Sequence, residues 1–553
     1  MSQKYLNSIF SAALSKVGID NNVSLIFDIP KIESHGDISC NIAMQLAKEL
    51  KKSPNEIANL ILNNLIFDKE IIESVNIANP GFININFTQK YFLENLLEVF
   101  DKKIQIGQQE IGKNIKVNIE YVSANPTGLL HLGHGRNACL GDTIANLYQW
   151  LGYEVTKEYY FNNAGNQMNN LTLSIYSRYR QSLDNPEYPF PENGYFGDYI
   201  KTIANELIEK YNDKLINNST ENLAIFKKYG EEWCFKTIEN TLDKMNIKQD
   251  VFYNEDSLYT DGKIQTLLED FEKKGLSYHK DGAVWLKLSE MGLEDDRVIV
   301  KSSGEPTYRL PDIAYHKEKF ARGFDLLIDI FGADHIATIP DVVAALKSFG
   351  FTDDKIKIVI HQFVTLTENG EQVKMSKRTG KSYTLDELLE EVGADVVRFF
   401  FIMRSCNTHL EFDLALAKEQ GDKNPVFYLQ YAHARCCSVI NNLLASEFDT
   451  NFSNNLNLNQ LIGLELNQYE IKLIKSMMLF EETIQIAATK TEPYILVEFL
   501  KDFASNFHNF YHNCRVIDSE LHIQQLRYIL LEISKRILKN GLTILGVSSP
   551  EKM

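Results

Sequence analysis

The segment of residues 116–153 constrains the fold more than any other part of the sequence. Its start, residues 117–122, is rich in β-branched and aromatic side chains, which is typical of a buried strand. The run SANPTG that follows contains Asn-Pro and Thr-Gly steps, which favour a turn. A helix is predicted to begin near His131 and to end at Gly152 as its C-cap, because apolar residues recur between them at three- and four-residue spacing. With a second strand predicted at 153–161, this segment is one βαβ unit of a parallel sheet.

Two histidines, His131 and His134, lie at the strand-to-helix turn of this unit. Ligands of open parallel sheets bind beyond the carboxyl ends of the strands, and the free N–H groups of a helix start favour anions. Gly133 and Gly135 would let a flat or phosphorylated ligand lie close to the backbone. Histidines three residues apart share a helix face and can donate hydrogen bonds to a phosphoryl group as its charge changes. Taken alone, the pattern is equally compatible with a helix start that carries two surface histidines.

A second motif, Lys374-Met-Ser-Lys377-Arg378, lies in a polar, Gly-containing loop after a strongly β-forming segment at 355–366. Two lysines three apart on a mobile loop can close over a triphosphate and neutralise charge on the leaving pyrophosphate. On the loop alone, a solvated basic loop is the simpler interpretation.

Together the two motifs resemble the HIGH and KMSKS signatures of class I aminoacyl-tRNA synthetases, with Leu132 in place of Ile and Arg378 in place of Ser. Their order and wide separation match that class. The resemblance implies a Rossmann-type α/β catalytic domain that uses ATP. It also implies catalytic roles for His131, His134, Lys374 and Lys377, and ATP-binding roles for Gly133, Gly135, Met375 and Ser376.

Composition limits the other classes of function. No apolar run reaches eighteen residues and no signal peptide is recognised, so we expect no membrane contact. The seven cysteines contain no CxxC pair, which predicts neither a zinc site nor a disulfide framework and favours a reduced, cytoplasmic protein. The net charge of −17 argues by itself against a nucleic-acid partner. RNA binding would therefore require a local concentration of Lys and Arg.

The 553 residues should form more than one domain. We predict a small N-terminal α+β domain at 1–108, a catalytic domain at 109–405 with an insertion at about 170–280, and an all-α helical bundle at 406–553 with a loop at about 446–461. In the N-terminal domain, helices are expected at 6–17, 38–50 and 53–65, and strands at 74–77 and 82–87; His35 and Asp37 are assigned only to a turn.

The substrate can be approached through charge. A guanidinium is always protonated and offers five donors in a plane, so a selective pocket needs carboxylates, amide oxygens and an aromatic face. Glu120, Asn125, Tyr308 and Asp312 are suitable candidates near predicted strand ends. Each also has a simpler explanation: Glu120 could be an exposed strand residue, and Asp312 could cap a helix after Pro311.

A more specific resemblance resolves these alternatives. The segments EYVSANPTG, PDIAYH, QYAHAR and LTILGVSSPEKM resemble bacterial arginyl-tRNA synthetases, and SHGDISCNIAMQLAK and NPGFININ resemble their extra N-terminal domain, which contacts the tRNA elbow. The resemblance implies L-arginine, ATP with Mg²⁺, and tRNA(Arg) as substrates, without a structural metal, in a protein we expect to be monomeric. The implied arginine-binding residues are Glu120, Ser123, Asn125, Tyr308 and Asp312, and the candidate tRNA contacts are Tyr428, Tyr431, Arg435 and Tyr511.

One departure and three alternatives remain. A glutamine that other members place near Ala333 is absent here, and Asp334 or Gln362 are the possible substitutes for its contact to the α-amino group. The alternatives are a class I synthetase for another amino acid, a small-molecule adenylyltransferase, which also uses an HxGH turn, and an inactive tRNA-binding relative. An adenylyltransferase would not need the long helical segment after the lysine motif.

Overall fold

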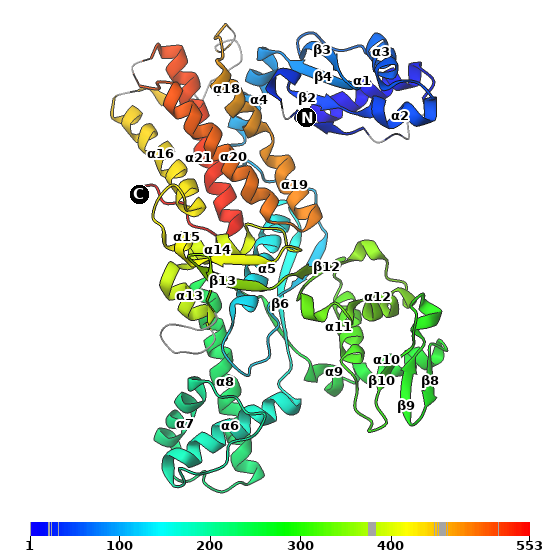
Figure 1. The fold of residues 1–553 in the computed structure, drawn as a ribbon, viewed down its shortest axis with the longest axis vertical. Helices are drawn as coiled ribbons and strands as arrows, with labels where there is room; N and C mark the ends of the chain where they lie inside the picture. The colour runs from blue at the N-terminus through cyan, green and yellow to red at the C-terminus, as the bar shows by residue number, and fades with distance from the viewer. Residues whose placement is uncertain are drawn as a thin grey trace. The chain divides into compact units, whose positions relative to one another are not determined.

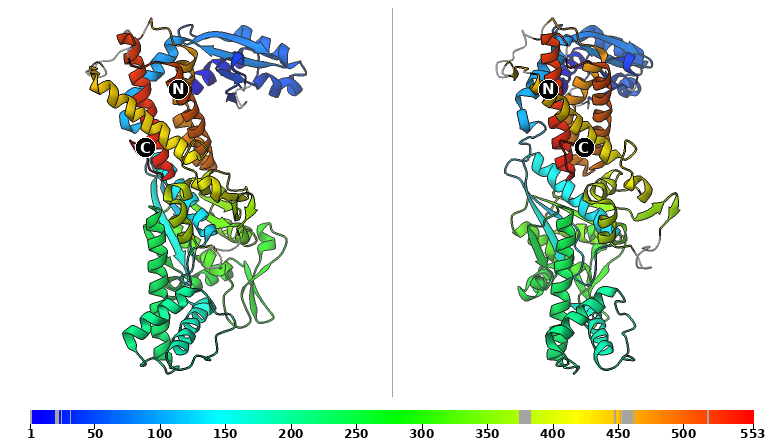
Figure 2. Two further views of the ribbon diagram at one scale, coloured as in Figure 1. Left: turned by 60° about the vertical axis from the view of Figure 1, so that its left-hand side comes forward. Right: turned by 90° about the vertical axis from the view of Figure 1, so that its left-hand side faces the viewer.

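The computed structural model describes residues 2–19, 23, 25–30, 32–373, 383–446, 448–450, 452, 461, 463–517 and 519–553 (Figures 1 and 2). The chain divides into two compact units. The first comprises Met1–Ile106, Cys436–Leu479 and Ser505–Arg536, and the second comprises Gly107–Arg435, Phe480–Ala504 and Ile537–Met553. The predicted helical segment at 406–553 is therefore shared between the two units.

The first unit contains a four-stranded antiparallel sheet of order β1-β2-β4-β3. Ser53 caps α3 as predicted, in a reciprocal capping box with Glu56. The helix predicted at 38–50 is wrong at its start, because Ile38 pairs with Ile85 in the sheet and the helix begins only at Ile42. The elements are α1 (Ser2–Lys16), β1 (Phe27–Asp28), β2 (Ile38–Cys40), α2 (Ile42–Leu50), α3 (Pro54–Asn64), β3 (Ile72–Ala78), β4 (Phe82–Phe87) and α4 (Gln89–Asp101).

Helical segments from the C-terminal part of the chain complete this unit. Their core is apolar, and the Glu470 carboxylate accepts from Arg527 Nε over 2.8 Å. The loop predicted at about 446–461 lies largely outside the described residues. The helices concerned are α18 (Gln468–Met478) and parts of α16 (Pro425–Ala445), α20 (Tyr494–Asn513) and α21 (Leu521–Leu545).

The second unit is built on a five-stranded, wholly parallel sheet of order β12-β11-β5-β6-β7. The predicted βαβ unit is present, with β5 in the middle of the sheet. Helix α5 ends one residue earlier than predicted, with Leu151 as its C-cap, and Gly152 follows at φ 85°. The elements are β5 (Lys116–Glu120), α5 (Leu132–Trp150), β6 (Glu154–Phe161), β7 (Val251–Asn254), β11 (Leu326–Gly332) and β12 (Ile356–His361).

The segment predicted as one insertion at 170–280 is two. Three helices with their own hydrophobic core come first and lie side by side in Figure 2. The chain then returns to the sheet as β7 before a second insertion with an antiparallel sheet of order β10-β9-β8. The elements of the first insertion are α6 (Gly165–Leu183), α7 (Asp198–Tyr211) and α8 (Thr220–Lys244), and those of the second are α9 (Asp256–Thr260), α10 (Lys263–Lys273), β8 (Ser277–Lys280), β9 (Ala283–Leu286) and β10 (Arg297–Val300). Helices α11 (Arg309–Ala321) and α12 (Ile339–Ser348) follow them, on either side of β11 in the chain.

A small sheet of order β14-β13-β15 follows the parallel one. The all-α prediction for 406–553 is wrong at its start, because Leu410–Asp413 pair with β13 as a parallel strand. The elements are β13 (Val364–Glu368), β14 (Glu371–Gln372), α13 (Leu385–Val392), α14 (Ala394–Ile402), β15 (Leu410–Asp413), α15 (Leu414–Lys418) and α19 (Phe480–Lys490). Among the helices described, none is both long and apolar enough to cross a membrane.

Candidate active site

The two histidines of the turn cap α5 reciprocally. His131 is the N-cap, and its Nδ1 accepts hydrogen bonds from the backbone N–H groups of Gly133, over 3.1 Å, and His134, over 3.4 Å. In return, His134 Nδ1 accepts from the His131 backbone N–H over 3.3 Å. Serine, threonine, asparagine and aspartate usually fill this role, so the helix start uses both histidines as structural groups as well.

This arrangement fixes the protonation of both rings. A neutral imidazole whose Nδ1 accepts must carry its proton on Nε2. Burial lowers the pKa of His131, and burial together with His131 and His361 lowers the pKa of His134 to about 3. The rings stack with centroids 3.6 Å apart. Near neutral pH the turn therefore presents two neutral Nε2–H donors side by side, which suits hydrogen bonds to an anionic ligand.

The turn that precedes the histidines has an unusual backbone. Val122 and Ser123 have φ values of 70° and 45°, a region that side-chain-bearing residues seldom adopt. Asn137, buried on α5, holds this turn in place: its Oδ1 accepts from Val122 N over 2.6 Å, and its Nδ2 donates to the carbonyl of Ile330 over 2.8 Å. One buried amide thus links the ends of β5 and β11 to the helix that carries the histidines.

A cleft of about 370 Å³ opens beside the histidine turn. His131 and Gly133 lie on one side of it, and Phe363, which is 61% exposed, lies in its wall. The lysine motif, with Lys374, Met375, Ser376, Lys377 and Arg378, lies outside the described residues. The other described residues of the wall are Leu132, Val364, Thr365, Leu366, Gln372, Val373 and Tyr383.

Packing against two helices requires a residue without a side chain at Gly135. A Cβ at this position would lie 2.7 Å from Leu385 Cδ1 and 2.8 Å from Phe401 Cε2. The residue is buried, and its missing side chain makes room for α13 and α14.

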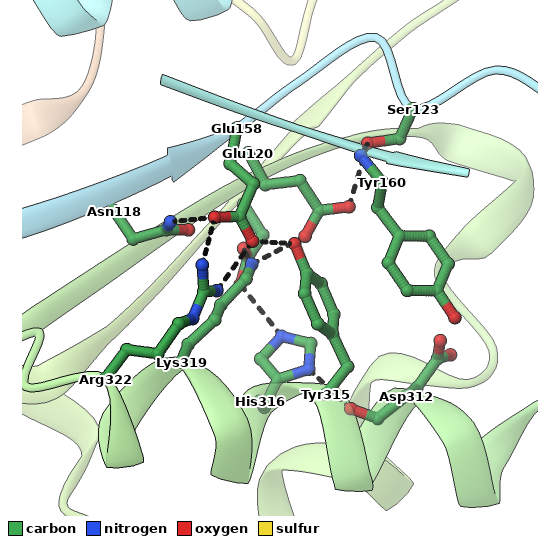
Figure 3. Close-up of polar contacts among 11 residues, drawn as sticks. Asn118, Glu120, Ser123, Glu158, Tyr160, Asp312, Tyr315, His316, Lys319 and Arg322 are labelled. Atoms are coloured by element: carbon green, nitrogen blue, oxygen red, sulfur yellow. Dashed lines mark hydrogen bonds and ion pairs between the residues drawn. The ribbon is translucent and has the colours of Figure 1, made fainter. Parts of the chain in front are cut away.

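A buried group of ion pairs lies under the carboxyl ends of the parallel strands (Figure 3). Lys319 Nζ, which is fully buried, contacts Glu120 Oε2 and Asp329 Oδ1, each over 2.6 Å. His316 Nε2 lies 3.0 Å from Asp329 Oδ2. Glu120 is therefore a buried, ion-paired residue, and its interpretation as an exposed strand residue is wrong.

A second pair lies beside the first. The Glu158 carboxylate accepts two hydrogen bonds from the Arg322 guanidinium, each over 2.7 Å, and one from Asn118 Nδ2 over 3.0 Å. The Tyr315 hydroxyl also donates to Glu158, as Figure 3 shows. The cations of α11 and its C-cap thus neutralise the carboxylates of β5, β6 and β11.

Two carboxylates at the same edge, Glu255 and Asp312, form no ion pair with a described Lys or Arg. Glu255 accepts a hydrogen bond from the Tyr160 hydroxyl over 2.7 Å. Figure 3 shows the Asp312 carboxylate directed toward the Tyr160 hydroxyl. Burial raises the pKa of Glu255, and it raises the pKa of Asp312 to about 7. A cationic ligand would relieve both charges.

The other predicted pocket residues are partly engaged. Ser123 Oγ donates to Glu120 Oε1 over 2.9 Å and accepts from Tyr160 N over 3.1 Å. Asn125 Oδ1 accepts from Asn162 N over 2.9 Å, which places its amide beside the polar run that follows β6.

Helix α11 settles the alternative role of Asp312. The helix begins at Arg309 with Tyr308 at the N-cap, so Asp312 lies inside the helix and is not its cap. Tyr308 is 82% exposed, one helical turn before Asp312.

Two residues are possible substitutes for the glutamine that is absent near Ala333. Asp334 acts electrostatically on His131, whereas the backbone carbonyl of Gln362 accepts a hydrogen bond from Arg136 over 2.7 Å.

Comparison with known proteins decides the family. A model described as "tRNA synthetases class I (R), catalytic domain" matches residues 95–399, and the arginine–tRNA ligase of Salinibacter ruber is 44% identical, covering 99% of this chain and 100% of its own. The chain belongs to the arginyl-tRNA synthetase family. The arginine–tRNA ligase of Chlorobaculum tepidum is 43% identical over 98% of both chains.

Two further family models match the parts of this arginyl-tRNA synthetase that lie on either side of the catalytic domain. An "Arginyl tRNA synthetase N terminal domain" model matches residues 4–87, and a "DALR anticodon binding domain" model matches 429–553. The solved structure of Thermus thermophilus arginyl-tRNA synthetase has the same fold, with a TM-score of 0.79 over the whole of both chains at 22% identity.

The residues predicted to contact tRNA lie on two helices, α16 and α20. All of them fall within the DALR match at 429–553 except Tyr428, which directly precedes it. On α16, the Arg435 guanidinium lies 5.0 Å from the centroid of the Tyr431 ring, which is 37% exposed, and Tyr428 is half-buried one turn away. On α20, Tyr511 stacks on Phe507 with centroids 6.4 Å apart.

Several site residues were not predicted from the sequence of this arginyl-tRNA synthetase family member. His316 and Lys319 follow Asp312 by four and seven residues, so a polar stripe on one helix face could have indicated them. Tyr160 and Glu255 lie at the ends of the adjacent strands β6 and β7, but β7 was included in the insertion. His361, at the end of β12, gave no local signal.

Proposed function

We propose that this chain is an arginine–tRNA ligase. It activates L-arginine with ATP to arginyl-adenylate and pyrophosphate, and the 3′-terminal ribose of tRNA(Arg) then accepts the arginyl group with release of AMP. The observation that carries the proposal is the pair of carboxylates without a cation, Asp312 and Glu255, at the sheet edge of a family member. A carboxylate pair of this kind favours a cationic side chain over a neutral one.

The histidine turn supports the activation step. Activation is an in-line displacement at the α-phosphorus, in which positioning and charge stabilisation supply most of the catalysis. The Nε2–H groups of His131 and His134 would donate to the α-phosphoryl oxygens as their charge shifts, and Gly133 would admit the nucleotide. Lys374 and Lys377 would neutralise the pyrophosphate, with Met375 and Ser376 on the same loop.

Magnesium is treated as part of the ATP substrate. Within the described residues, no group of three or more His, Cys, Asp or Glu side chains could hold a metal ion. A magnesium ion that coordinates ATP phosphates usually keeps several water ligands and needs few protein ligands.

The pocket supports arginine over lysine. Asp312 would pair with the guanidinium in its plane, Glu255 would take a second edge, and the Tyr308 ring would cover the face. Lysine has a compact ammonium that cannot fill such a fork. We further propose that Ser123 and Asn125 contact the carboxylate and amino end of the substrate, and that Asp334 replaces the absent glutamine.

The anticodon stem is proposed to meet the helical region that the DALR model covers. Unpaired bases stack on aromatic rings and on Arg guanidinium planes, and the Tyr431–Arg435 pair offers both. Tyr428 and Tyr511 are further candidates. We propose that the enzyme acts as a cytoplasmic monomer, for which light scattering should return a single mass near 63.4 kDa.

The test is to offer total tRNA with each of twenty labelled amino acids. Only arginine should become attached to tRNA. Attachment of a different amino acid would identify another class I synthetase, and pyrophosphate release without any tRNA-borne product would favour an adenylyltransferase. Absence of both would indicate an inactive tRNA-binding relative.

A further inference from the structure

Helix α13 is attached to the histidine turn at its first residues. Its N-cap, Thr384, forms an antiparallel bridge with His131, and the Leu385 backbone N–H donates to the Leu130 carbonyl over 2.9 Å. The Leu385 side chain is fully buried against Gly135. The backbone position of His131 therefore depends on where α13 begins.

The next residue of α13 is held by the first insertion. The Asp386 carboxylate accepts from Thr241 Oγ1 over 2.6 Å and pairs with Lys244 Nζ at 2.5 Å. Thr241 and Lys244 are three residues apart at the end of α8, so they share one face of that helix. One carboxylate thus receives two bonds from a helix that belongs to a different part of the catalytic unit.

The contact of Asp386 with Thr241 and Lys244 should contribute little to the stability of the fold. The Lys244 side chain is 50% exposed and that of Asp386 is 22% exposed, and ion pairs with this exposure contribute little to folding. Its geometry is more informative, because two bonds to Oδ1 and Oδ2 of one side chain fix both the position and the orientation of the first turn of α13.

We propose that Asp386 is a positioning residue for the adenylation step. By fastening α13 to α8, it holds the Leu130–His131 backbone, and hence the two Nε2–H donors, where the α-phosphoryl group must lie. This inference rests on the proposed function. According to this inference, the end of α8 contributes to catalysis, although α8 carries none of the reacting groups.

The test compares variants at both ends of the contact. Asp386→Ala removes both bonds, and Thr241→Val with Lys244→Met removes the same two bonds from the other side. Lys228→Met is the matched control, since Lys228 pairs with Glu232 on the same helix at 3.9 Å with both side chains exposed. Single-turnover adenylate formation, the arginine KM, tRNA charging and the melting temperature are measured for each protein.

Asp386→Ala should lower the rate of adenylate formation about tenfold, because small displacements of catalytic groups cost up to a hundredfold. Its arginine KM should change by less than about twofold, and adding Asp386→Ala to the double variant should cost nothing more. The control should match the unchanged protein.

The inference is overturned if the unchanged protein charges arginine while Asp386→Ala keeps its full rate. It is also overturned if the rate falls only in proportion to the unfolded fraction, or if the losses at the two ends add. Failure of the unchanged protein to charge arginine would refute the proposed function instead.

Discussion

Arginine binding should be linked to the ionisation of Asp312. Burial raises the pKa of this carboxyl to about 7, with Glu120 and Glu255 adding to the effect and His316 and Lys319 opposing it. A guanidinium can pair only with the ionised form. Protons and arginine therefore compete for the same site, and lowering the pH should weaken arginine binding.

The size of the effect follows from the pKa. With a pKa of about 7, roughly one molecule in eleven is ionised at pH 6 and ten in eleven at pH 8. The apparent dissociation constant scales inversely with the competent fraction, so it should rise about tenfold between pH 8 and pH 6, equivalent to ~1.4 kcal/mol. Binding at pH 6 should also release close to one proton.

Isothermal titration with arginine at pH 6, 7 and 8, in buffers of different ionisation enthalpy, measures both quantities. Asp312→Asn is the control: its amide keeps the shape of the side chain but cannot titrate, so binding should be weaker and nearly independent of pH. Constant affinity from pH 6 to pH 8, without proton release in the unchanged protein, would refute the linkage and remove Asp312 from the pocket.

Three further predictions concern the turn and the pocket. Replacing His131 or His134 by alanine should raise the barrier to adenylate formation by about 3 kcal/mol, and so lower its rate, while the ATP KM changes little; stopped-flow measurement over a range of ATP concentrations tests this, and a change confined to KM would contradict it. Gly135→Ala should lower the free energy of unfolding by about 1–3 kcal/mol, because its Cβ would overlap Leu385; chemical denaturation provides the value, and unchanged stability would mean that α13 can shift. Glu255→Gln should raise the arginine KM about tenfold without affecting ATP, since a charge-assisted bond is lost; equal loss for both substrates would place Glu255 outside the amino-acid pocket.

The regular core of the fold was predictable because its signals are local. The strand at Lys116–Glu120, the capped helix at Leu132–Trp150 and the next strand, which ends at Phe161, follow from apolar spacing within one continuous segment of the chain. Short strands were missed where their partners are distant. Val251–Asn254 is only four residues long and follows a helical stretch, so nothing local distinguishes it from the rest of the insertion.

The site was predictable to the extent that its groups lie within motifs. His131 and His134 were found from four residues of sequence, whereas the ion pair of Glu120 with Lys319 joins residues 199 apart and depends on the pairing of β5 with β11. The packing role of Gly135 was not predictable for the same reason: Leu385, its neighbour, is 250 residues further along the chain.

The backbone at Val122 and Ser123 has a consequence for how stability and activity are balanced. Positive φ at a residue with a side chain costs on the order of 1–2 kcal/mol. Val122 is only 7% exposed, so Val122→Gly would relieve that strain but would also remove a buried apolar side chain and give the unfolded chain more freedom. These two losses outweigh the relief, so the variant should melt at a lower temperature. The buried side chain thus holds the strained turn that directs Ser123 toward Glu120, and the glycine variant should lose stability and activity together.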